Sequence, residues 1–325
     1  MAEPFISVVV PVHNGATTID RCLQAATSVD YPNFEVVVVD DGSTDGTAEI
    51  VRRHRVKLVQ LKPNRGASAA RNAGVAAASG EYVFFTDDDC VVQRDTLRKA
   101  ARAIAEEGRD CVIGGTYTPL AHDHGLYNSF QSVFIHYSET KYREPDYIAT
   151  HAMLIPRQMF LDSKRFDEGF LPILEDVDFC HRMRREGKRL VMRPELVVGH
   201  IFQFDLWRSL RNAYRKSRWW VTYSLANKDL LADSGTASVE LKTNVVLWPF
   251  TVAALALAAV LGAQPWVWVA AALLLLNLSV SRGLVAAYIR ARGGIGFTFG
   301  ALLYYLFVYP IAVGLGGLRG LFGRR

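Results

Sequence analysis

The amino-acid sequence predicts an α/β fold with a mostly parallel central sheet, followed by C-terminal transmembrane α-helices. Three observations carry this prediction. In the first part of the chain, β-branched runs alternate with helical segments, which is typical of a doubly wound sheet. Unusual polar residues follow these runs, at the strand ends where such sheets bind ligands. In the last third of the 325-residue chain, apolar segments are about as long as a membrane-spanning helix.

The alternation of strands and helices is clearest before residue 90. Short runs rich in Val, Ile and Phe have strand character, and Gly, Pro and Asn close them. Segments with helical spacing connect each run to the next, as parallel neighbours require. The predicted strands are 5–12, 34–39, 56–61 and 82–85, and the predicted helices are 17–28, 47–54 and 67–78.

Three consecutive aspartates end the fourth predicted strand. Asp87, Asp88 and Asp89 follow the apolar run 82–85 after a single threonine. Charge at the tip of a buried strand needs a compensating partner. A divalent cation such as Mg²⁺ or Mn²⁺, which takes carboxylate, phosphate and water ligands, suits this position. A solvated acidic turn is the alternative.

The pattern changes after residue 110. Residues 111–204 contain shorter and less regular strands, and we expect this half to bind a second substrate. Within it, Glu175 and Asp176 open a predicted helix that Gly187 stops. Acidic residues in a first helical turn also interact favourably with the helix dipole, so capping alone is an alternative role for them.

Three apolar segments define a predicted membrane domain over residues 245–325. It follows a basic, aromatic helix at 205–230 and a linker at 231–244, and the segments are 245–263, 265–281 and 295–318. The first two are expected to form a hairpin that returns Arg282 to the cytoplasm, as the positive-inside tendency favours. A complete third span would leave the C-terminal arginines outside. A re-entrant pair, broken at Gly300 and Pro310, is the alternative for that segment.

Composition indicates the cellular compartment of the protein and the class of its binding partners. The four scattered cysteines have no spacing typical of a zinc site or a disulfide framework. No secretory leader is recognisable, so we expect the α/β domain to face the cytoplasm from a multi-pass anchor in the inner membrane. The net charge of +5 is concentrated at 182–218 and beside the apolar segments, which favours membrane lipids or a phosphate-bearing substrate over nucleic acid.

The polar motifs of the α/β part follow one another in a specific order. They are Pro11-Val12-His13-Asn14, Asp40-Asp41-Gly42-Ser43-Thr44-Asp45, Asn64-Arg65-Gly66, Ala70-Arg71-Asn72-Ala73-Gly74, Asp87-Asp88-Asp89 and Glu175-Asp176-Val177-Asp178. Over residues 5–200 this set closely resembles the family 2 glycosyltransferases. The resemblance implies the Rossmann-like GT-A fold over residues 1–230, with the nucleotide-sugar half at 1–110. It also implies sugar transfer from a nucleoside diphosphate donor with inversion at the anomeric carbon.

The resemblance further implies roles for single residues. The positions that match the donor nucleotide site are Pro11, Asn14, Asp40, Asp41, Arg71 and Asp87. Asp40 or Asp41 would accept a hydrogen bond from the base, and a UDP-sugar is favoured. Asp87 and Asp89 match the ends of the family's Asp-x-Asp motif, with Asp89 as a metal ligand and Asp87 on ribose or metal. Asp176 matches the general base that takes the acceptor's proton, with Glu175 as its neighbour.

Two further assignments have structural alternatives. His200, at the end of a predicted strand, is either a further metal ligand or a satisfied polar group. Arg218 and Trp219 resemble part of the Gln-x-x-Arg-Trp motif with which processive members bind the acceptor, but Arg215 stands at the glutamine position. A basic amphipathic helix lying on anionic lipid explains this segment equally well.

The leading hypothesis is therefore a metal-dependent, inverting glycosyltransferase that acts on a hydroxyl of a lipid-linked or cell-envelope glycan acceptor. A polyprenyl-phosphate glycosyltransferase would share the donor site, but an ionised phosphate acceptor has no proton for Asp176 to remove. A non-catalytic membrane scaffold that keeps the fold is an alternative of another class. The presence of all the expected carboxylates argues against it.

Overall fold

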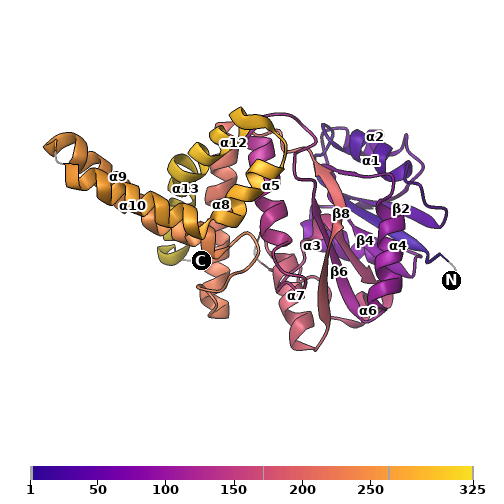
Figure 1. Cartoon of the computed structure of the whole chain (residues 1–325). Coiled ribbons are helices and arrows are strands. Elements are labelled where there is room, and N and C mark those ends of the chain that lie inside the picture. Colours follow the sequence, from indigo (N-terminus) through magenta and orange to yellow (C-terminus); the bar gives the residue numbers. More distant parts are fainter. Residues whose placement is uncertain (1–2, 171, 263, 324–325) are drawn as a thin grey trace. The chain divides into compact units, whose positions relative to one another are not determined.

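The computed structural model of the chain describes residues 3–170, 172–262 and 264–323 (Figure 1). The chain forms two compact units. The sheet unit comprises Met1–Asp123 and Glu139–Phe202, and the helical unit comprises His124–Ser138 and Gln203–Arg325. Residues 124–138 thus belong to the helical unit, and the prediction that they form part of an acceptor-binding half at 111–204 is wrong for this segment. Phe130 explains this placement, because its ring stacks on Tyr288 at a centroid distance of 5.6 Å.

An eight-stranded sheet in the order β3-β2-β1-β4-β7-β6-β8-β5 forms the centre of the sheet unit. Strands β1 to β4 are parallel neighbours, as predicted. Strand β7 pairs antiparallel with β4 and β6, and β5 pairs antiparallel with β8. The mostly parallel α/β sheet is confirmed. Its strands are β1 Ile6–Val12, β2 Phe34–Asp41, β3 Lys57–Leu61, β4 Tyr82–Phe85, β5 Cys90–Val92, β6 Cys111–Tyr117, β7 Met153–Pro156 and β8 Arg189–His200.

Helices connect these strands and pack against the sheet. They are α1 Ile19–Thr27, α2 Thr47–Val51, α3 Ala67–Ala77, α4 Thr96–Glu107, the 3₁₀ turn η1 Thr150–Ala152, α6 Arg157–Asp162 and α7 Glu175–Arg185. Strands β1 and β4 are buried throughout, which explains their continuous apolar sequence. Helix α3 lies close to β1 because Gly74 has no side chain. A Cβ atom at Gly74 would lie 2.4 Å from Cγ1 of Val9.

An aromatic cluster holds α6 and α7 against the end of β4. Phe85, the last residue of β4, lies 5.6 Å from both Phe160 and Phe166, between ring centroids. Phe179 of α7 lies 4.9 Å from Phe166. All four rings are buried, and such tilted pairs stabilise a core beyond the area that they bury. The cluster therefore places the first turn of α7 beside the strand that precedes the three aspartates.

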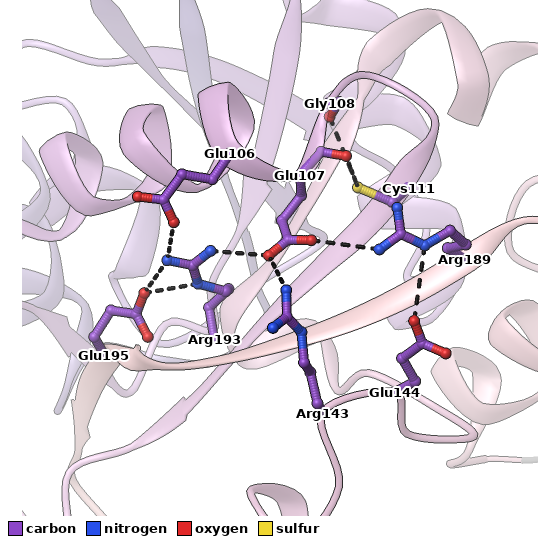
Figure 2. Close-up of polar contacts among 9 residues, drawn as sticks. All are labelled: Glu106, Glu107, Gly108, Cys111, Arg143, Glu144, Arg189, Arg193 and Glu195. Atoms are coloured by element: carbon purple, nitrogen blue, oxygen red, sulfur yellow. Dashed lines mark hydrogen bonds and ion pairs between the residues drawn. The ribbon is translucent and has the colours of Figure 1, made fainter.

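An ion-pair network centred on Glu107 connects the end of α4 to β8 (Figure 2). The Glu107 carboxylate is only 5% exposed and accepts hydrogen bonds from Arg143 at 3.0 Å and Arg193 at 2.9 Å. Arg189 of β8 forms a third ion pair with it at 3.4 Å. One buried carboxylate thus joins a helix, a strand and the loop that contains Arg143.

The helical unit consists of one helix from the first half of the chain and all those after residue 205. They are α5 Leu126–Glu139, α8 Leu206–Asn227, α9 Val239–Leu261, α10 Gln264–Val280, α11 Arg282–Arg290, α12 Gly294–Leu303, the π-helical turn η2 Tyr304–Val308 and α13 Tyr309–Phe322. Asp205 caps α8 by accepting a hydrogen bond from the Arg208 amide, so the predicted basic helix begins as expected. Helices α9 and α10 lie side by side as a hairpin (Figure 1).

Two helical stretches within the described residues are long and apolar enough to cross a membrane, Val239–Leu261 and Gly294–Phe322. Helices α10 and α11 add a third candidate if this pair, bent by 70°, is counted as one span. Helix α9 begins before the predicted boundary at 245, because the Ser238 hydroxyl caps it by accepting from the Leu241 amide. The predicted end of that segment, Ala263, and the arginines 324 and 325 lie outside the described residues.

The third apolar segment is one continuous helical run rather than a re-entrant pair. The π-helical turn η2 lies directly before Pro310 and explains how the helix continues past this residue. Proline removes a backbone donor and clashes with the preceding turn of an α-helix, and a π-bulge relieves that clash. Two carbonyls of this turn accept hydrogen bonds from side chains of α9. Tyr305 accepts from Asn244 at 2.7 Å and Phe307 accepts from Trp248 at 2.9 Å.

Candidate active site

The carboxyl ends of β1, β2 and β4 lie at the same edge of the sheet, because these strands are parallel neighbours. Val12 pairs with Asp40, and Val9 pairs with Phe85. Pro11 is buried near the end of β1. The polar motifs that follow the three strands therefore gather at one edge, as the sequence predicted.

The loop after β1 is linked to the loop after β2. Asn14 has a positive φ of 54°, a conformation that asparagine tolerates better than most residues. The side-chain oxygen of Asn14 accepts from the Thr44 backbone amide at 2.8 Å. The backbone amide of Asn14 donates to the Ser43 hydroxyl at 2.9 Å. The exposed Asn14 side chain thus holds two strand-end loops in one arrangement.

Asp40 and Asp41 are both buried, and each has loop partners. Asp40 accepts from the Ser43 amide at 3.0 Å. Asp41 accepts from the amides of Arg65 at 2.8 Å and Gly66 at 2.7 Å, so it fixes the loop between β3 and α3. A carboxylate has about four acceptor positions, so these bonds leave acceptor capacity on both groups.

A buried arginine joins two acidic motifs that are far apart in the sequence. Arg71, on α3, donates to Asp87 at 2.8 Å and to Glu175 at 2.6 Å. Burial raises the pKa of Asp87, but the Arg71 charge outweighs burial and holds that pKa below its usual value. The sequence predicted these three residues for the site without predicting this bridge, which positions α7 beside the aspartates.

Asp176 adjoins the bridge. Its carboxylate accepts from its neighbour's amide, that of Val177, at 2.9 Å and from the Thr150 amide at 3.3 Å. Burial and the charge of Glu175 raise the pKa of Asp176 to about 6, against the lowering effect of Arg71. A carboxylate with a pKa near the working pH can both accept and release a proton, which suits a general base.

Asp88 faces the loop after β1. A Cβ atom at Gly15 would lie 2.2 Å from Oδ2 of Asp88, so the carboxylate sits directly over this glycine. The Thr18 hydroxyl lies 3.5 Å from the same oxygen. Burial and the charge of Asp87 raise the pKa of Asp88 to about 7. These contacts connect Asp88 to the loop after β1 and to the start of α1.

Strand pairing brings His200 to Asp89. Cys90 of β5 pairs with His200 of β8, which places Nε2 of His200 3.4 Å from Oδ1 of Asp89. Each of three residues, Asp89, Cys90 and His200, offers one possible ligand atom, and these three atoms lie within 4.8 Å of one another. Such a group can hold a metal ion.

The chemistry of these donors fits a divalent cation. Burial and the charges of Asp87 and Asp88 raise the pKa of Asp89 well above its usual value, so a bound cation would relieve this repulsion. Carboxylate and imidazole suit Mn²⁺, and carboxylate suits Mg²⁺. The Cys90 thiol is a poorer ligand, because burial and Asp89 raise its pKa and keep it protonated.

Sequence reasoning missed a buried polar cluster next to His200 of this candidate metal site. Glu139 accepts from the Thr116 hydroxyl at 2.7 Å, and Nε2 of His151 lies 3.3 Å from the same oxygen. The His151 ring stacks on Tyr117 at 3.9 Å, and Tyr117 meets the His200 ring at 4.7 Å. No local motif marks these residues. Their only signal is polar side chains within otherwise apolar segments.

Arg218 and Trp219 lie on α8 in the helical unit. The Arg218 guanidinium lies 4.7 Å from the centroid of the Trp219 ring, a cation–π contact. The other predicted site residues belong to the sheet unit. A role for this pair in acceptor binding stays a prediction.

Comparison with known proteins identifies the family. The sequence model described as Glycosyl transferase family 2 matches residues 7–170, about half of the chain. The chain belongs to glycosyltransferase family 2. Glycosyltransferase AglE of Haloferax volcanii is 31% identical to it over 246 residues, which cover 66% of this chain and 80% of AglE.

Two bacterial relatives of this family 2 chain match it over shorter regions. Glycosyltransferase GlyG of Streptococcus pneumoniae is 33% identical over 127 residues, 38% of this chain and 42% of GlyG. Poly(ribitol-phosphate) beta-N-acetylglucosaminyltransferase TarS of Staphylococcus aureus is 40% identical over 114 residues, 33% of this chain and 20% of TarS. The match thus covers less than half of each of these two relatives.

Among solved structures, the mannosyltransferase PcManGT from Pyrobaculum calidifontis, in complex with GDP-Man and Mn²⁺, resembles this glycosyltransferase. The TM-score is 0.61 at 20% identity, over 100% of this chain and 89% of PcManGT. This likeness confirms the predicted GT-A fold. Family membership makes the protein a transferase enzyme, so the scaffold alternative is set aside.

Proposed function

We propose that the protein is an inverting glycosyltransferase that moves a sugar from a UDP-sugar to a hydroxyl group of a lipid-linked or cell-envelope glycan. One observation carries the proposal. Arg71 joins Asp87, on the donor side, to Glu175, and Asp176 next to Glu175 has a pKa of about 6. A base that shares one rigid bridge with the donor site is positioned for direct displacement at the anomeric carbon.

In this proposal the nucleotide lies at the strand-end edge. Pro11 and Asn14 shape the loop around the nucleoside, Asp40 or Asp41 accepts from an N–H of the base, and Asp87 contacts the ribose. Arg71 keeps Asp87 ionised and in place. The acceptor hydroxyl gives its proton to Asp176 as the new glycosidic bond forms, and the diphosphate leaves with the bonding electrons.

Asp89 and His200, with Asp87, would hold a divalent cation. When bound, Mg²⁺ or Mn²⁺ supplies positive charge to the diphosphate leaving group. The Mn²⁺ in the PcManGT complex and the donor set of this chain support this assignment.

The apolar helices support a membrane location. We propose a multi-pass protein of the inner membrane whose sheet unit faces the cytoplasm. The chain is also similar to the putative teichuronic acid biosynthesis glycosyltransferase TuaG of Bacillus subtilis and the succinoglycan biosynthesis protein ExoO of Rhizobium meliloti, which supports a glycan acceptor.

A donor screen tests the proposal. Detergent-solubilised protein is incubated with UDP-, GDP- and dTDP-sugars, with Mg²⁺, Mn²⁺ or EDTA, and with or without membrane lipid extract, and nucleoside diphosphate release is measured. We expect release from a UDP-sugar that needs both metal and extract. The variant Asp89→Ala should lose at least about 100-fold in rate and also lose Mn²⁺ binding measured by electron paramagnetic resonance. Equal release in EDTA would contradict the metal assignment.

A further inference from the structure

The imidazole of His200 needs support beyond the backbone that carries it. The main chain there is held by strand pairing, because Cys90 of β5 pairs with His200 and the His122 amide donates to the His200 carbonyl at 3.1 Å. The Ile201 amide donates to the Asp89 carbonyl at 2.9 Å. These bonds fix the main chain but not the side-chain torsion angles of His200. The direction of Nε2 therefore depends on the groups that surround the ring.

Two aromatic rings restrict the imidazole. Phe202 stacks on it, with the ring centroids 3.8 Å apart and an interplanar angle of 24°. Tyr117, the last residue of β6, meets it at 4.7 Å and 73°. Because one ring lies nearly parallel to the imidazole and the other nearly perpendicular to it, they oppose its rotation. The pair thus keeps Nε2 of His200 at its position 3.4 Å from Oδ1 of Asp89.

The buried polar cluster holds Tyr117 in turn. His151 stacks on the Tyr117 ring at 3.9 Å and 23°. Nε2 of His151 lies 3.3 Å from Oε2 of Glu139, and the same oxygen accepts from the hydroxyl of Thr116 at 2.7 Å. All four side chains are buried, and all four residues belong to the sheet unit. The cluster therefore fixes Tyr117 both through its ring and through the residue before it.

The polar character of this cluster points to orientation of a neighbouring group. Burying a carboxylate, an imidazole and a hydroxyl costs free energy that apolar side chains of similar volume avoid. In return, a satisfied polar network favours one arrangement of its members, because hydrogen bonds depend on direction. Residues behind a ligating histidine orient its ring in this way, and their loss typically lowers metal affinity roughly 10- to 100-fold.

We infer that Tyr117 is a positioning residue for the metal ligand His200, and that Glu139 and His151 hold Tyr117 in that role. The inference rests on the proposed function, in which His200 and Asp89 bind a divalent cation. Tyr117 acts through His200 and needs no contact of its own with the cation or the sugar.

The test measures Mn²⁺ binding to the full chain in detergent by electron paramagnetic resonance, first with Mn²⁺ alone and then with UDP. The electron spin echo of bound Mn²⁺ is modulated by a directly bonded imidazole nitrogen, which reports whether His200 is a ligand. We expect Tyr117→Leu to raise the Kd for Mn²⁺ at least about tenfold and to lose most of this modulation. His151→Leu should act in the same direction. Tyr117→Phe keeps the ring and should stay within about threefold of wild type.

Two further variants separate positioning from stability. Tyr31→Leu is the matched control, because Tyr31 is a buried tyrosine whose hydroxyl donates to the Pro4 carbonyl, before the start of β1. It should lower the melting temperature without changing the Kd or the nitrogen modulation. Phe202→Leu removes the stacked ring instead of Tyr117, and it should fold because Phe202 is only half-buried. We expect it to raise the Kd and weaken the modulation as Tyr117→Leu does.

The outcomes distinguish this inference from the proposed function. If wild type shows a nitrogen modulation that His200→Ala removes, an unchanged Kd and modulation in Tyr117→Leu and Phe202→Leu would overturn the inference alone. An equal loss in Tyr31→Leu would show a general effect of lost stability and would also overturn it. Mn²⁺ binding by wild type without nitrogen modulation would exclude His200 as a ligand. No Mn²⁺ binding by wild type, with or without UDP, would reject the metal assignment of the proposed function and this inference with it.

Discussion

The carboxylate of Asp176 accepts from two backbone amides, but its burial and the neighbouring charge of Glu175 decide its pH behaviour. Burial and Glu175 raise its pKa from the usual 3.8 to about 6. The group therefore carries a proton in acid and becomes an effective base only as the pH rises through about 6. A carboxylate with an ordinary pKa would already be ionised two pH units lower.

From this shift we expect kcat/KM to fall about tenfold per pH unit below about 6 and to level off above it. Steady-state rates at saturating metal, measured from pH 4.5 to 8, check the profile. Asp178→Asn is the matched control, because Asp178 lies in the same first turn of α7 but pairs with Arg182 at 2.8 Å. A profile that stays flat down to pH 5 would contradict the role of Asp176.

Gly15 is a second position where a single atom matters. In Gly15→Ala the new methyl group would overlap Oδ2 of Asp88 and Cγ2 of Val12, at 2.2 and 2.6 Å. The loop that contains Asn14 must then move, so we expect KM for the donor to rise at least about tenfold and stability to fall by about 1–3 kcal/mol. Donor kinetics and thermal unfolding measure both effects. Gly169→Ala, where a Cβ atom would have only an ordinary contact at 3.5 Å, should change neither.

At the scale of elements, Glu107 shows how one residue joins several segments. Its charge lies between Arg143, Arg189 and Arg193, as Figure 2 shows. Burial raises the pKa of Glu107. The hydrogen bond from Arg193 and the charges of the three arginines outweigh burial, so that pKa stays below the usual 4.5. Its contribution to stability is therefore present above pH 4.5 and is lost as the pH falls through the lowered pKa.

We expect Glu107→Gln to lower the free energy of unfolding by about 1–3 kcal/mol at pH 7, because three arginines lose their shared partner. The difference from wild type should shrink as the pH falls below 4.5. Denaturant unfolding at both pH values measures it. Glu106→Gln is the control, because Glu106 is 49% exposed and contacts Arg193 alone among these arginines. Equal losses in the two variants would show that the network has no centre at Glu107.

In the helical unit, the bond from Asn244 to the π-helical turn before Pro310 allows a similar test of stability. Asn244 donates to the Tyr305 carbonyl and accepts from Asn277, each at 2.7 Å. Asn244→Ala leaves both groups buried without this partner, which should cost about 1–2 kcal/mol and lower the melting temperature in detergent. Val246→Ala, on an exposed part of α9, is the control. An unchanged melting temperature in Asn244→Ala would show that the turn does not need the asparagine.

At the scale of the whole molecule, local patterns and long-range pairings were not equally predictable. The parallel strands β1 to β4 and the first turn of α7 follow from periodicity and capping, and both agree with the sequence prediction. The pairing of β5 with β8, which brings His200 to Asp89, depends on residues more than a hundred positions apart and has no local signal. The contact of Arg71 with Glu175 spans 104 positions and was not predictable for the same reason, whereas the His151 cluster joins residues closer in sequence that no local motif marks.

The helical unit shows the same division between composition and arrangement. Apolar length predicted candidate spans, and two of them are present in the described residues. Composition does not determine where such a helix bends. The break lies between α10 and α11, whereas the run from Gly294 to Phe322 continues through Pro310 by means of a π-helical turn.

The most direct test of the account compares wild type with Asp176→Asn on two acceptors, using the donor found in the screen. One acceptor is a prenyl-linked sugar with a free hydroxyl group, and the other is prenyl phosphate. We expect wild type to glycosylate the hydroxyl acceptor, and the asparagine variant to be at least about 100-fold slower while its donor Kd is unchanged. Full activity of Asp176→Asn on prenyl phosphate, with no transfer to the hydroxyl by either protein, would contradict the assignment of Asp176 as the base.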